Sequence, residues 1–89
     1  MLRITTTESA GTEVTILLEG TIAGHDVQEV RVACQDILMS GRQLTLDLAG
    51  TSFVDNNGVA FLQSLVARDV RLLNCSGFVT EQLKPRKLE

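Results

Sequence analysis

The sequence predicts one small α/β domain with a mixed β-sheet of about four strands and helices packed mainly on one face. Three observations support this fold class. Alternating apolar runs and runs with helical spacing follow each other in the order strand, strand, helix, strand, helix, strand, helix. Each strand–helix–strand step implies a right-handed crossover between parallel strands. The first two strands are apolar mainly on one side, which favours a sheet with one covered face.

The chain has 89 residues, of which 44% are hydrophobic, and a formal net charge of -3. This length allows a single domain, which we place at residues 1–87, with residues 88–89 as a candidate expression-tag remnant. The negative charge and the absence of Tyr and Trp argue against nucleic-acid binding. No apolar run approaches the ~20 residues that span a bilayer, so we expect a soluble, cytoplasmic protein without direct membrane insertion. Cys34 and Cys75 lie in apolar patterns and are expected to be free thiols.

The first two strands are predicted at residues 2–7 and 13–19, where apolar and polar residues alternate. Small and polar residues at 8–12 join them, which is typical of a β-hairpin. The first helix is expected to begin at Asp26, because Asp is a good N-cap and Glu29 follows three residues later. Gly41 is expected to end this helix in the left-handed conformation.

The central strand is predicted at residues 44–48, where Leu44, Leu46 and Leu48 point to one side. A turn-rich polar segment is expected next, followed by a second helix with an apolar stripe made of Val59, Leu62, Leu65 and Val66. A fourth strand is predicted at residues 70–75 and a short last helix at residues 77–84.

The segment between the central strand and the second helix ends in Asp55-Asn56-Asn57-Gly58. Any of the three side chains before Gly58 can accept hydrogen bonds from the first N–H groups of the helix, and Asp55 is expected to cap the helix or brace the loop. Gly58 is expected to let the backbone turn closely into the helix. Phe61 either packs under the neighbouring helix or belongs to an exposed apolar patch beside the helix start.

The run Asp-Leu-Ala-Gly-Thr-Ser-Phe-Val-Asp-Asn-Asn-Gly-Val-Ala-Phe-Leu at residues 47–62 resembles the signature of STAS domains, which occur in anti-sigma factor antagonists and sulphate transporters. The likeness covers about the middle third of the chain, and the order of the flanking elements agrees with it. In the phospho-regulated antagonists a Ser or Thr follows the motif Asp and is phosphorylated by a partner kinase. Here that position is Asn56, which cannot take a phosphate.

The resemblance implies a non-catalytic interaction module that works by partner switching. The expected contact residues are the loop Asp55, Asn56, Asn57 and Gly58, with Gly24, His25, Val59 and Ala60 beside it. The expected partner is an anti-sigma factor with a kinase-like ATP-binding fold. An alternative is a structural STAS subunit that braces the ATPase of a lipid-transport ABC system. A homodimer is also compatible with the sequence, because a four-stranded sheet leaves an exposed edge.

Catalytic, metal and cofactor sites are not expected. Asp47 and Asp55 are the carboxylates near the central loop, and no nucleophile–base pair or metal-ligand cluster accompanies them. His25 is the single histidine and cannot build a metal site with other histidines. The glycines match no phosphate-binding loop.

Overall fold

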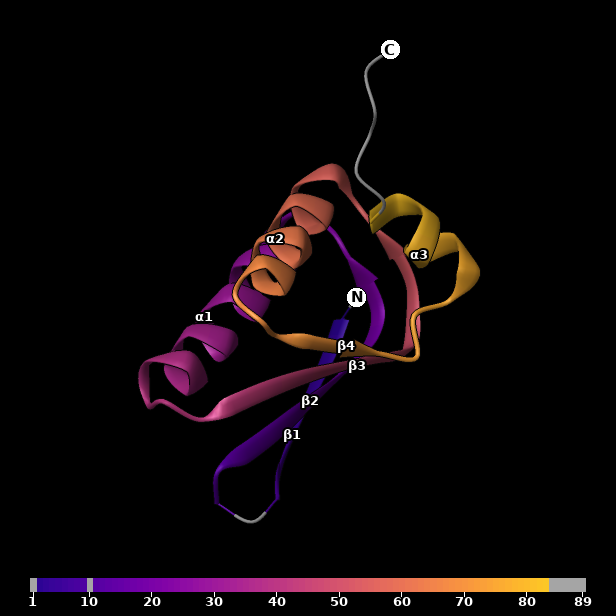
Figure 1. Ribbon diagram of the computed structural model, residues 1–89. Coiled ribbons are helices and arrows are strands. Elements are labelled where there is room, and N and C mark those ends of the chain that lie inside the picture. Colours follow the sequence, from indigo (N-terminus) through magenta and orange to yellow (C-terminus); the bar gives the residue numbers. More distant parts are fainter. Residues whose placement is uncertain (1, 10, 84–89) are drawn as a thin grey trace.

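The computed structural model describes residues 2–9 and 11–83 as a four-stranded sheet with three helices (Figure 1). The elements are β1 (Leu2–Ser9), β2 (Glu13–Ile22), α1 (His25–Met39), β3 (Gln43–Val54), α2 (Asn56–Ala67), β4 (Arg71–Leu73) and α3 (Gly77–Leu83). This order and the predicted fold class are confirmed. Lys84, the predicted end of the last helix, and the proposed tag residues 88–89 lie outside the described residues.

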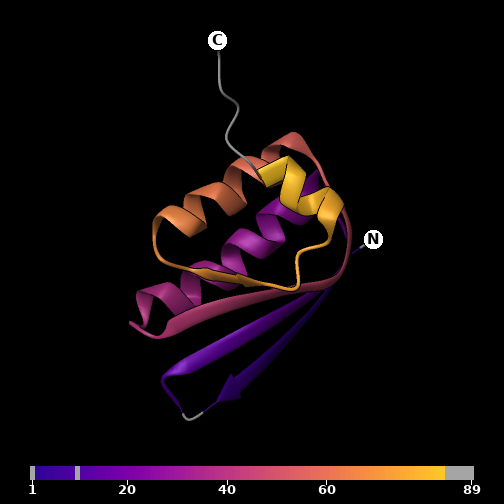
Figure 2. The same cartoon turned by 45° about the vertical axis from the view of Figure 1, so that its right-hand side comes forward.

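The sheet has the strand order β1-β2-β3-β4. The hairpin strands β1 and β2 are antiparallel, whereas β2 with β3 and β3 with β4 are parallel. The parallel pairs are joined by α1 and α2, as the crossover rule requires. The helices lie over one face of the sheet, and the β1–β2 hairpin projects beyond them (Figures 1 and 2).

The core lies between the sheet and the helices, because alternate strand residues face the helical layer. Ile16, Leu18, Leu46 and Leu48 are fully buried on that side of β2 and β3. They meet the apolar stripes of the two long helices. The buried helix residues are Val27, Val30, Cys34 and Ile37 of α1 and Phe61, Leu62 and Leu65 of α2.

The central strand is longer than its alternation predicts, so the expected turn-rich segment before Asp55 is wrong. β3 continues to Val54 and has twelve residues against the ten of β2, because the pairing register shifts twice. Each shift inserts one extra β3 residue, which is a β-bulge. The spacing of buried residues therefore changes from two to three, from Leu48 to Thr51 to Val54. The buried Thr51 hydroxyl donates a 2.9 Å hydrogen bond to the Leu18 carbonyl. This bond gives the carbonyl a partner at the first register shift, where the regular strand pairing is interrupted.

The start of α1 also differs from the prediction. Its N-cap is Gly24, with a φ of 58° and no side-chain cap, so the predicted N-cap role of Asp26 is wrong. The left-handed Gly24 turns the chain two residues earlier, and the Asp26 carboxylate instead accepts a 3.4 Å hydrogen bond from the N–H of Ala23. Gly41, after the other end of the helix, has a φ of 80°, which confirms its left-handed conformation.

The rotation of α2 is fixed by packing that the apolar periodicity does not reveal. Phe61, Leu62 and Leu65 are buried, whereas Val66, predicted in the buried stripe, is 51% exposed. Apolar residues surround the start of α2, so their spacing alone does not select one face. The close contact of Gly58 with the strands, described below, selects it.

Candidate functional site

The candidate site lies at the carboxyl ends of the parallel strands β2 and β3. Neighbouring parallel strands end on the same side of the sheet, so the helices that follow them begin next to each other there. β2 leads through Ala23 and Gly24 into α1, and β3 leads through Asp55 into α2. Ile22 pairs with Val54 in the last register of the two strands. The segment after β2 and the segment after β3, about thirty residues apart in sequence, therefore lie next to each other at the carboxyl ends of these strands.

Asp55 joins these two segments. Its carboxylate accepts a 2.7 Å hydrogen bond from the N–H of Gly58, which makes Asp55 the N-cap of α2 as expected. The other carboxylate oxygen accepts a 2.9 Å bond from the N–H of Gly24. The Asp55 N–H donates to the Ile22 carbonyl at 2.9 Å. Backbone hydrogen bonds from Gly24, Gly58 and Asn57 hold the pKa of Asp55 below its ordinary value and outweigh the opposing effect of desolvation.

Gly58 permits the close approach of α2 to the strand ends. It is buried, and a Cβ at this position would lie 2.6 Å from Cγ1 of Val54 and 3.1 Å from the carbonyl oxygen of Ile22. No side chain can occupy that space without moving the helix or the strands. Gly58 therefore fixes how closely α2 approaches the strand ends, and, being buried, it is not part of the exposed surface of the candidate site.

The other predicted contact residues follow Asp55 in the chain or lie at Gly24, which Asp55 holds by a hydrogen bond, and at the next residue. Gly24, His25, Asn56, Asn57 and Ala60 are exposed, and Val59 is half-buried. We call these six residues the helix-start surface. Within the described parts of the chain, the side-chain amides of Asn56 and Asn57 make no hydrogen bonds to other residues. The surface therefore presents uncharged donors and acceptors to solvent.

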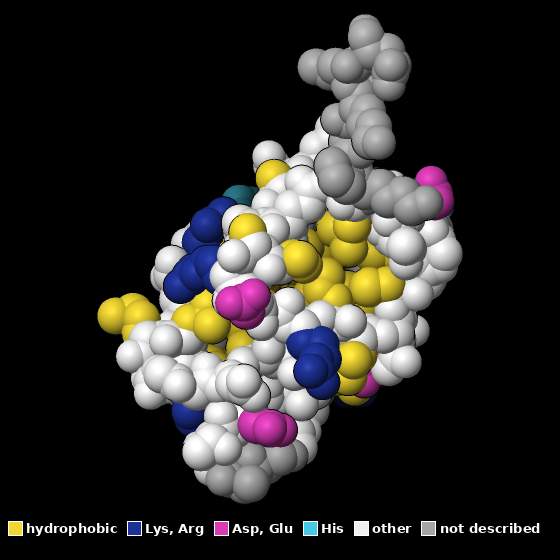
Figure 3. All heavy atoms as spheres, in the orientation of Figure 1, with side chains coloured by type: hydrophobic (Ala, Val, Ile, Leu, Met, Phe, Trp, Pro, Cys, Tyr) yellow, Lys and Arg dark blue, Asp and Glu magenta, His cyan; other side chains and the backbone are white. Residues whose placement is uncertain are grey.

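Phe61 does not belong to this surface. Its side chain is buried, and the guanidinium carbon of Arg31 on α1 lies 4.9 Å from the centre of its ring. The interpretation that Phe61 packs under the neighbouring helix is confirmed. Hydrophobic side chains reach the surface between α2 and α3 (Figure 3). Among the side chains of these helices that the structure describes, the half-buried hydrophobic ones are Val59, which is also part of the helix-start surface, and Leu83.

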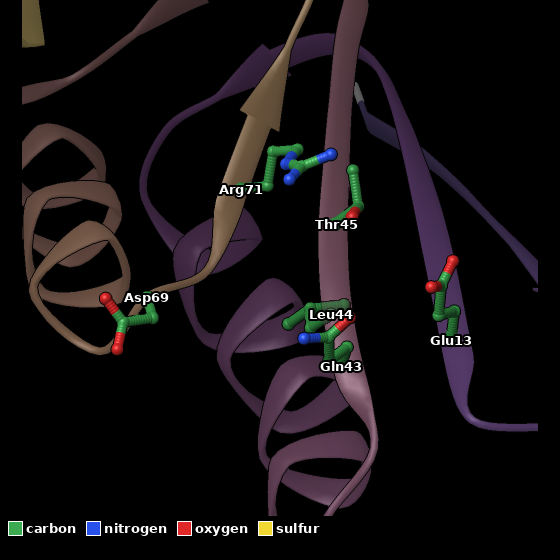
Figure 4. Close-up of a pocket in the computed structure, with 6 residues that line it drawn as sticks. All are labelled: Glu13, Gln43, Leu44, Thr45, Asp69 and Arg71. Atoms are coloured by element: carbon green, nitrogen blue, oxygen red, sulfur yellow. The ribbon is translucent and has the colours of Figure 1, made fainter.

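A polar hollow of about 140 Å³ lies at the amino ends of the parallel strands (Figure 4). Its lining residues are Glu13, Gln43, Leu44, Thr45, Asp69 and Arg71. Most of these side chains are exposed, and the hollow lies away from the helix-start surface. It lacks the apolar walls of a typical ligand pocket.

The two cysteines are free, as predicted. Burial raises the pKa of Cys34 to about 12, so this thiol stays protonated at neutral pH. Among residues 2–9 and 11–83, no cluster of three His, Cys, Asp or Glu side chains could hold a metal ion, and no helix is long and apolar enough to cross a membrane.

Sequence reasoning identified the cap at Asp55 but missed its bond to Gly24. The two residues are 31 positions apart, and no local pattern connects them. The resemblance placed Gly24 beside the loop that contains Asp55, and the parallel pairing expected for β2 and β3 agrees with this, but neither indicates which atoms bond.

No profile of a known family and no curated protein matches the sequence. Solved structures do match. The anti-sigma factor antagonist SpoIIAA, in its unphosphorylated form, aligns over 98% of this chain and 88% of its own with a TM-score of 0.71 and 23% identity. An uncharacterized protein with a SpoIIAA-like fold from Shewanella loihica PV-4 aligns over 86% of this chain and 69% of its own, with a TM-score of 0.57 and 9% identity.

A structure described as Mglu aligns over 74% of this chain but only 18% of its own, with a TM-score of 0.57 and 27% identity. The SpoIIAA match extends over nearly the whole chain and therefore identifies the architecture. The chain has the fold of the anti-sigma factor antagonist SpoIIAA, which is the STAS-type fold that its central motif predicts.

Proposed function

We propose that this protein is a non-catalytic interaction module of the anti-sigma-factor-antagonist type, which binds a protein partner through the helix-start surface. The observation that carries the proposal is the pair of hydrogen bonds that the Asp55 carboxylate accepts from Gly24 and Gly58, which we call the Asp55 clamp. By bonding both Gly24 and Gly58, Asp55 holds two helix starts in one rigid group. A surface that is already ordered loses little conformational entropy when a partner binds.

The composition of the helix-start surface supports a protein partner. Asn56, Asn57 and Ala60 expose uncharged groups, so a partner can cover them without desolvating a formal charge. Asp55 is the nearby carboxylate of the clamp, and its oxygens already accept backbone hydrogen bonds. The partner we propose is an anti-sigma factor with a kinase-like ATP-binding fold.

Asn56 is the residue that sets the regulation. It occupies the position where phospho-regulated relatives carry a Ser or Thr, and an amide cannot accept a phosphoryl group. In those relatives a phosphate adds about two negative charges, which weaken an interface by repulsion and desolvation. This chain would therefore bind its partner without that switch, under the control of its abundance or of a different signal.

The proposal is tested by affinity capture from the organism that makes the protein, with wild type and Asn56→Asp as baits. The acid has nearly the shape of the amide and supplies one of the negative charges of a phosphate. We expect wild type to recover an anti-sigma factor with a kinase-like fold and Asn56→Asp to lose it. Equal recovery with both baits would place the interface elsewhere.

The identity of the captured protein separates two functions. Recovery of the ATPase of a lipid-transport ABC system, in place of an anti-sigma factor, would assign the chain to the structural-subunit alternative. Both functions use the same fold, so identifying the partner by mass spectrometry is the deciding readout.

A further inference from the structure

We propose that the outer edge of β1 pairs with β1 of a second copy, so that two four-stranded sheets join into one continuous sheet. This inference concerns a different surface from the proposed function. The β1 edge and the helix-start surface share no residue.

β1 lies at one end of the sheet, and its eight residues all pair with β2 in an unbroken register. On its other side, no strand of the described chain pairs with it. Alternate N–H and C=O groups of an edge strand point outward and can accept another strand. Proteins usually block such an edge with Pro, Lys or a bulge. Residues 2–9 contain no Pro, Lys or bulge. Their charged side chains, Arg3 and Glu8, stand near the two ends of the strand, and the Glu8 carboxylate lies 3.4 Å from the Arg42 guanidinium.

The opposite edge of the sheet is protected. β4 has three residues, and Asp69 and Asn74 on either side of it have positive φ angles of 66° and 58°. The extended conformation therefore ends at once in both directions. Where β3 runs on beyond β4, the Gln82 side chain of α3 donates to the Val54 carbonyl at 2.8 Å. The long, regular edge is thus β1.

The helical layer leaves space beside β1. Thr6 and Glu8 are exposed although they pair with the buried Ile16 and Val14 on the helix side of the sheet. Leu2 and Ile4, on the same side, are only half-buried. Both views show the hairpin extending away from the helices (Figures 1 and 2). A second strand added to this edge would cover the apolar groups that the helices leave half-exposed.

A second copy of β1 is the occupant that fits this edge. An unpaired strand needs another extended backbone, and β1 itself supplies one of equal length. In a two-fold antiparallel pair centred on Thr5, residues 2–8 pair, with Ile4 opposite Thr6, Arg3 opposite Thr7 and, at the two ends of the ladder, Leu2 opposite Glu8 of the other copy. No like charges face each other, and β-branched residues fill the centre, which stabilises a strand pair.

Other registers fit less well. An axis at Arg3 places the two Arg3 guanidinium groups opposite each other, which is destabilising. An axis at Ile4 shortens the ladder to residues 2–6. An axis at Thr6 leaves Leu2 outside the ladder and moves Glu8 from the end of the ladder to a position opposite Ile4. The geometry therefore selects the axis at Thr5. A dimer of this kind would carry two helix-start surfaces, which favours binding to a dimeric partner through a raised effective concentration.

The test is sedimentation velocity of wild type from micromolar to millimolar concentration, with charge variants at the proposed axis. We expect a concentration-dependent monomer–dimer equilibrium. Thr5→Lys and Thr5→Asp each place like charges on the axis and should weaken dimerisation about tenfold or more. An equimolar mixture of the two variants should restore the dimer, because Lys then faces Asp. Gln35→Lys, on the exposed side of α1, is the matched charge control and should behave as wild type.

Circular dichroism of each variant confirms that it is folded, and Thr5 is exposed, so either charge can be solvated. A wild type that stays monomeric at every concentration would overturn the proposal. So would a mixture of the Lys and Asp variants that fails to dimerise, because it would show that Thr5 does not face its own copy.

Discussion

The carboxylate of Asp55 accepts a 2.9 Å hydrogen bond from the backbone N–H of Gly24, 31 residues earlier in the chain. The same carboxylate caps α2 through the N–H of Gly58. One side chain therefore fixes the start of α2 and ties it to the segment that leads into α1.

Replacing Asp55 with Asn should lower the thermal unfolding midpoint and make it less dependent on pH. The lowered pKa means that the unfolded chain binds this proton more readily than the folded chain does. The stabilisation is therefore present above the ordinary pKa of 3.8 and is lost as the pH falls through the lower folded value. Urea unfolding of both proteins from pH 7 to pH 3 should show the difference between them shrinking. A difference that grows on acidification would contradict the clamp.

Replacing Gly58 with Ala should destabilise the fold by about 1–3 kcal/mol, the usual cost of overpacking. The new methyl group would lie 2.6 Å from Val54 Cγ1 and 3.2 Å from Ile22 Cγ2. Gly77→Ala is the matched control, because a Cβ there meets nothing within 4 Å at the start of another helix. Chemical denaturation should show a large loss for Gly58→Ala and little change, or a small gain, for Gly77→Ala. Equal effects would mean that α2 does not approach the strands as closely as described.

Replacing Thr51 with Val should cost about 0.5–1.5 kcal/mol, the typical net value of one hydrogen bond. The substitution keeps the shape of the side chain but removes the hydroxyl that donates to the Leu18 carbonyl at 2.9 Å. Ser52→Ala is the comparison, since the exposed Ser52 hydroxyl makes a longer bond of 3.3 Å to Gly20. Urea unfolding should rank Thr51→Val as the more destabilising change. The reverse order would argue against the hydrogen bond between Thr51 and Leu18.

Replacing Arg31 with Gln should weaken the contact between α1 and α2 by about 0.5–1 kcal/mol, the range for an exposed cation–π pair. The guanidinium of Arg31 lies over the Phe61 ring, and Gln keeps much of the side-chain length without the charge. Arg68→Gln, at the exposed C-cap of α2, controls for the loss of one positive charge. Thermal unfolding should separate the two variants. Identical unfolding midpoints for the two variants would show that the contact between Arg31 and Phe61 does not stabilise the fold.

The elements with regular patterns could be predicted from the sequence. Alternation at Leu44, Leu46 and Leu48 and the stripe in α1 placed a strand and a helix correctly. The continuation of β3 could not be predicted, because two bulges change the burial spacing to three and make the segment resemble a turn. A bulge is favoured by cross-strand contacts, such as Thr51 with Leu18, that no local pattern shows.

The cap at Asp55 could be predicted from the sequence, but the contacts that hold the two helix starts in place could not. The side-chain chemistry of Asp55 at a predicted helix start identified it as a cap, and the resemblance gave the neighbouring Asn residues as expected contact residues. The role of Gly24 as the cap of α1 was missed, because Asp26 looked like a better cap and only the left-handed turn at Gly24 displaces it. The rotation of α2 was also hidden, since it depends on how Gly58 packs against Ile22 and Val54.

The most direct test of the proposed function is the affinity of the captured partner, purified, for three forms of this protein, measured by titration calorimetry. Asn56→Asp should raise the dissociation constant about tenfold or more, because a new carboxylate must be desolvated at the interface. Gln35→Glu makes the same amide-to-acid change on the exposed side of α1 and should bind like wild type. If Asn56→Asp binds as tightly as wild type while remaining folded, the helix-start surface is not where the partner binds.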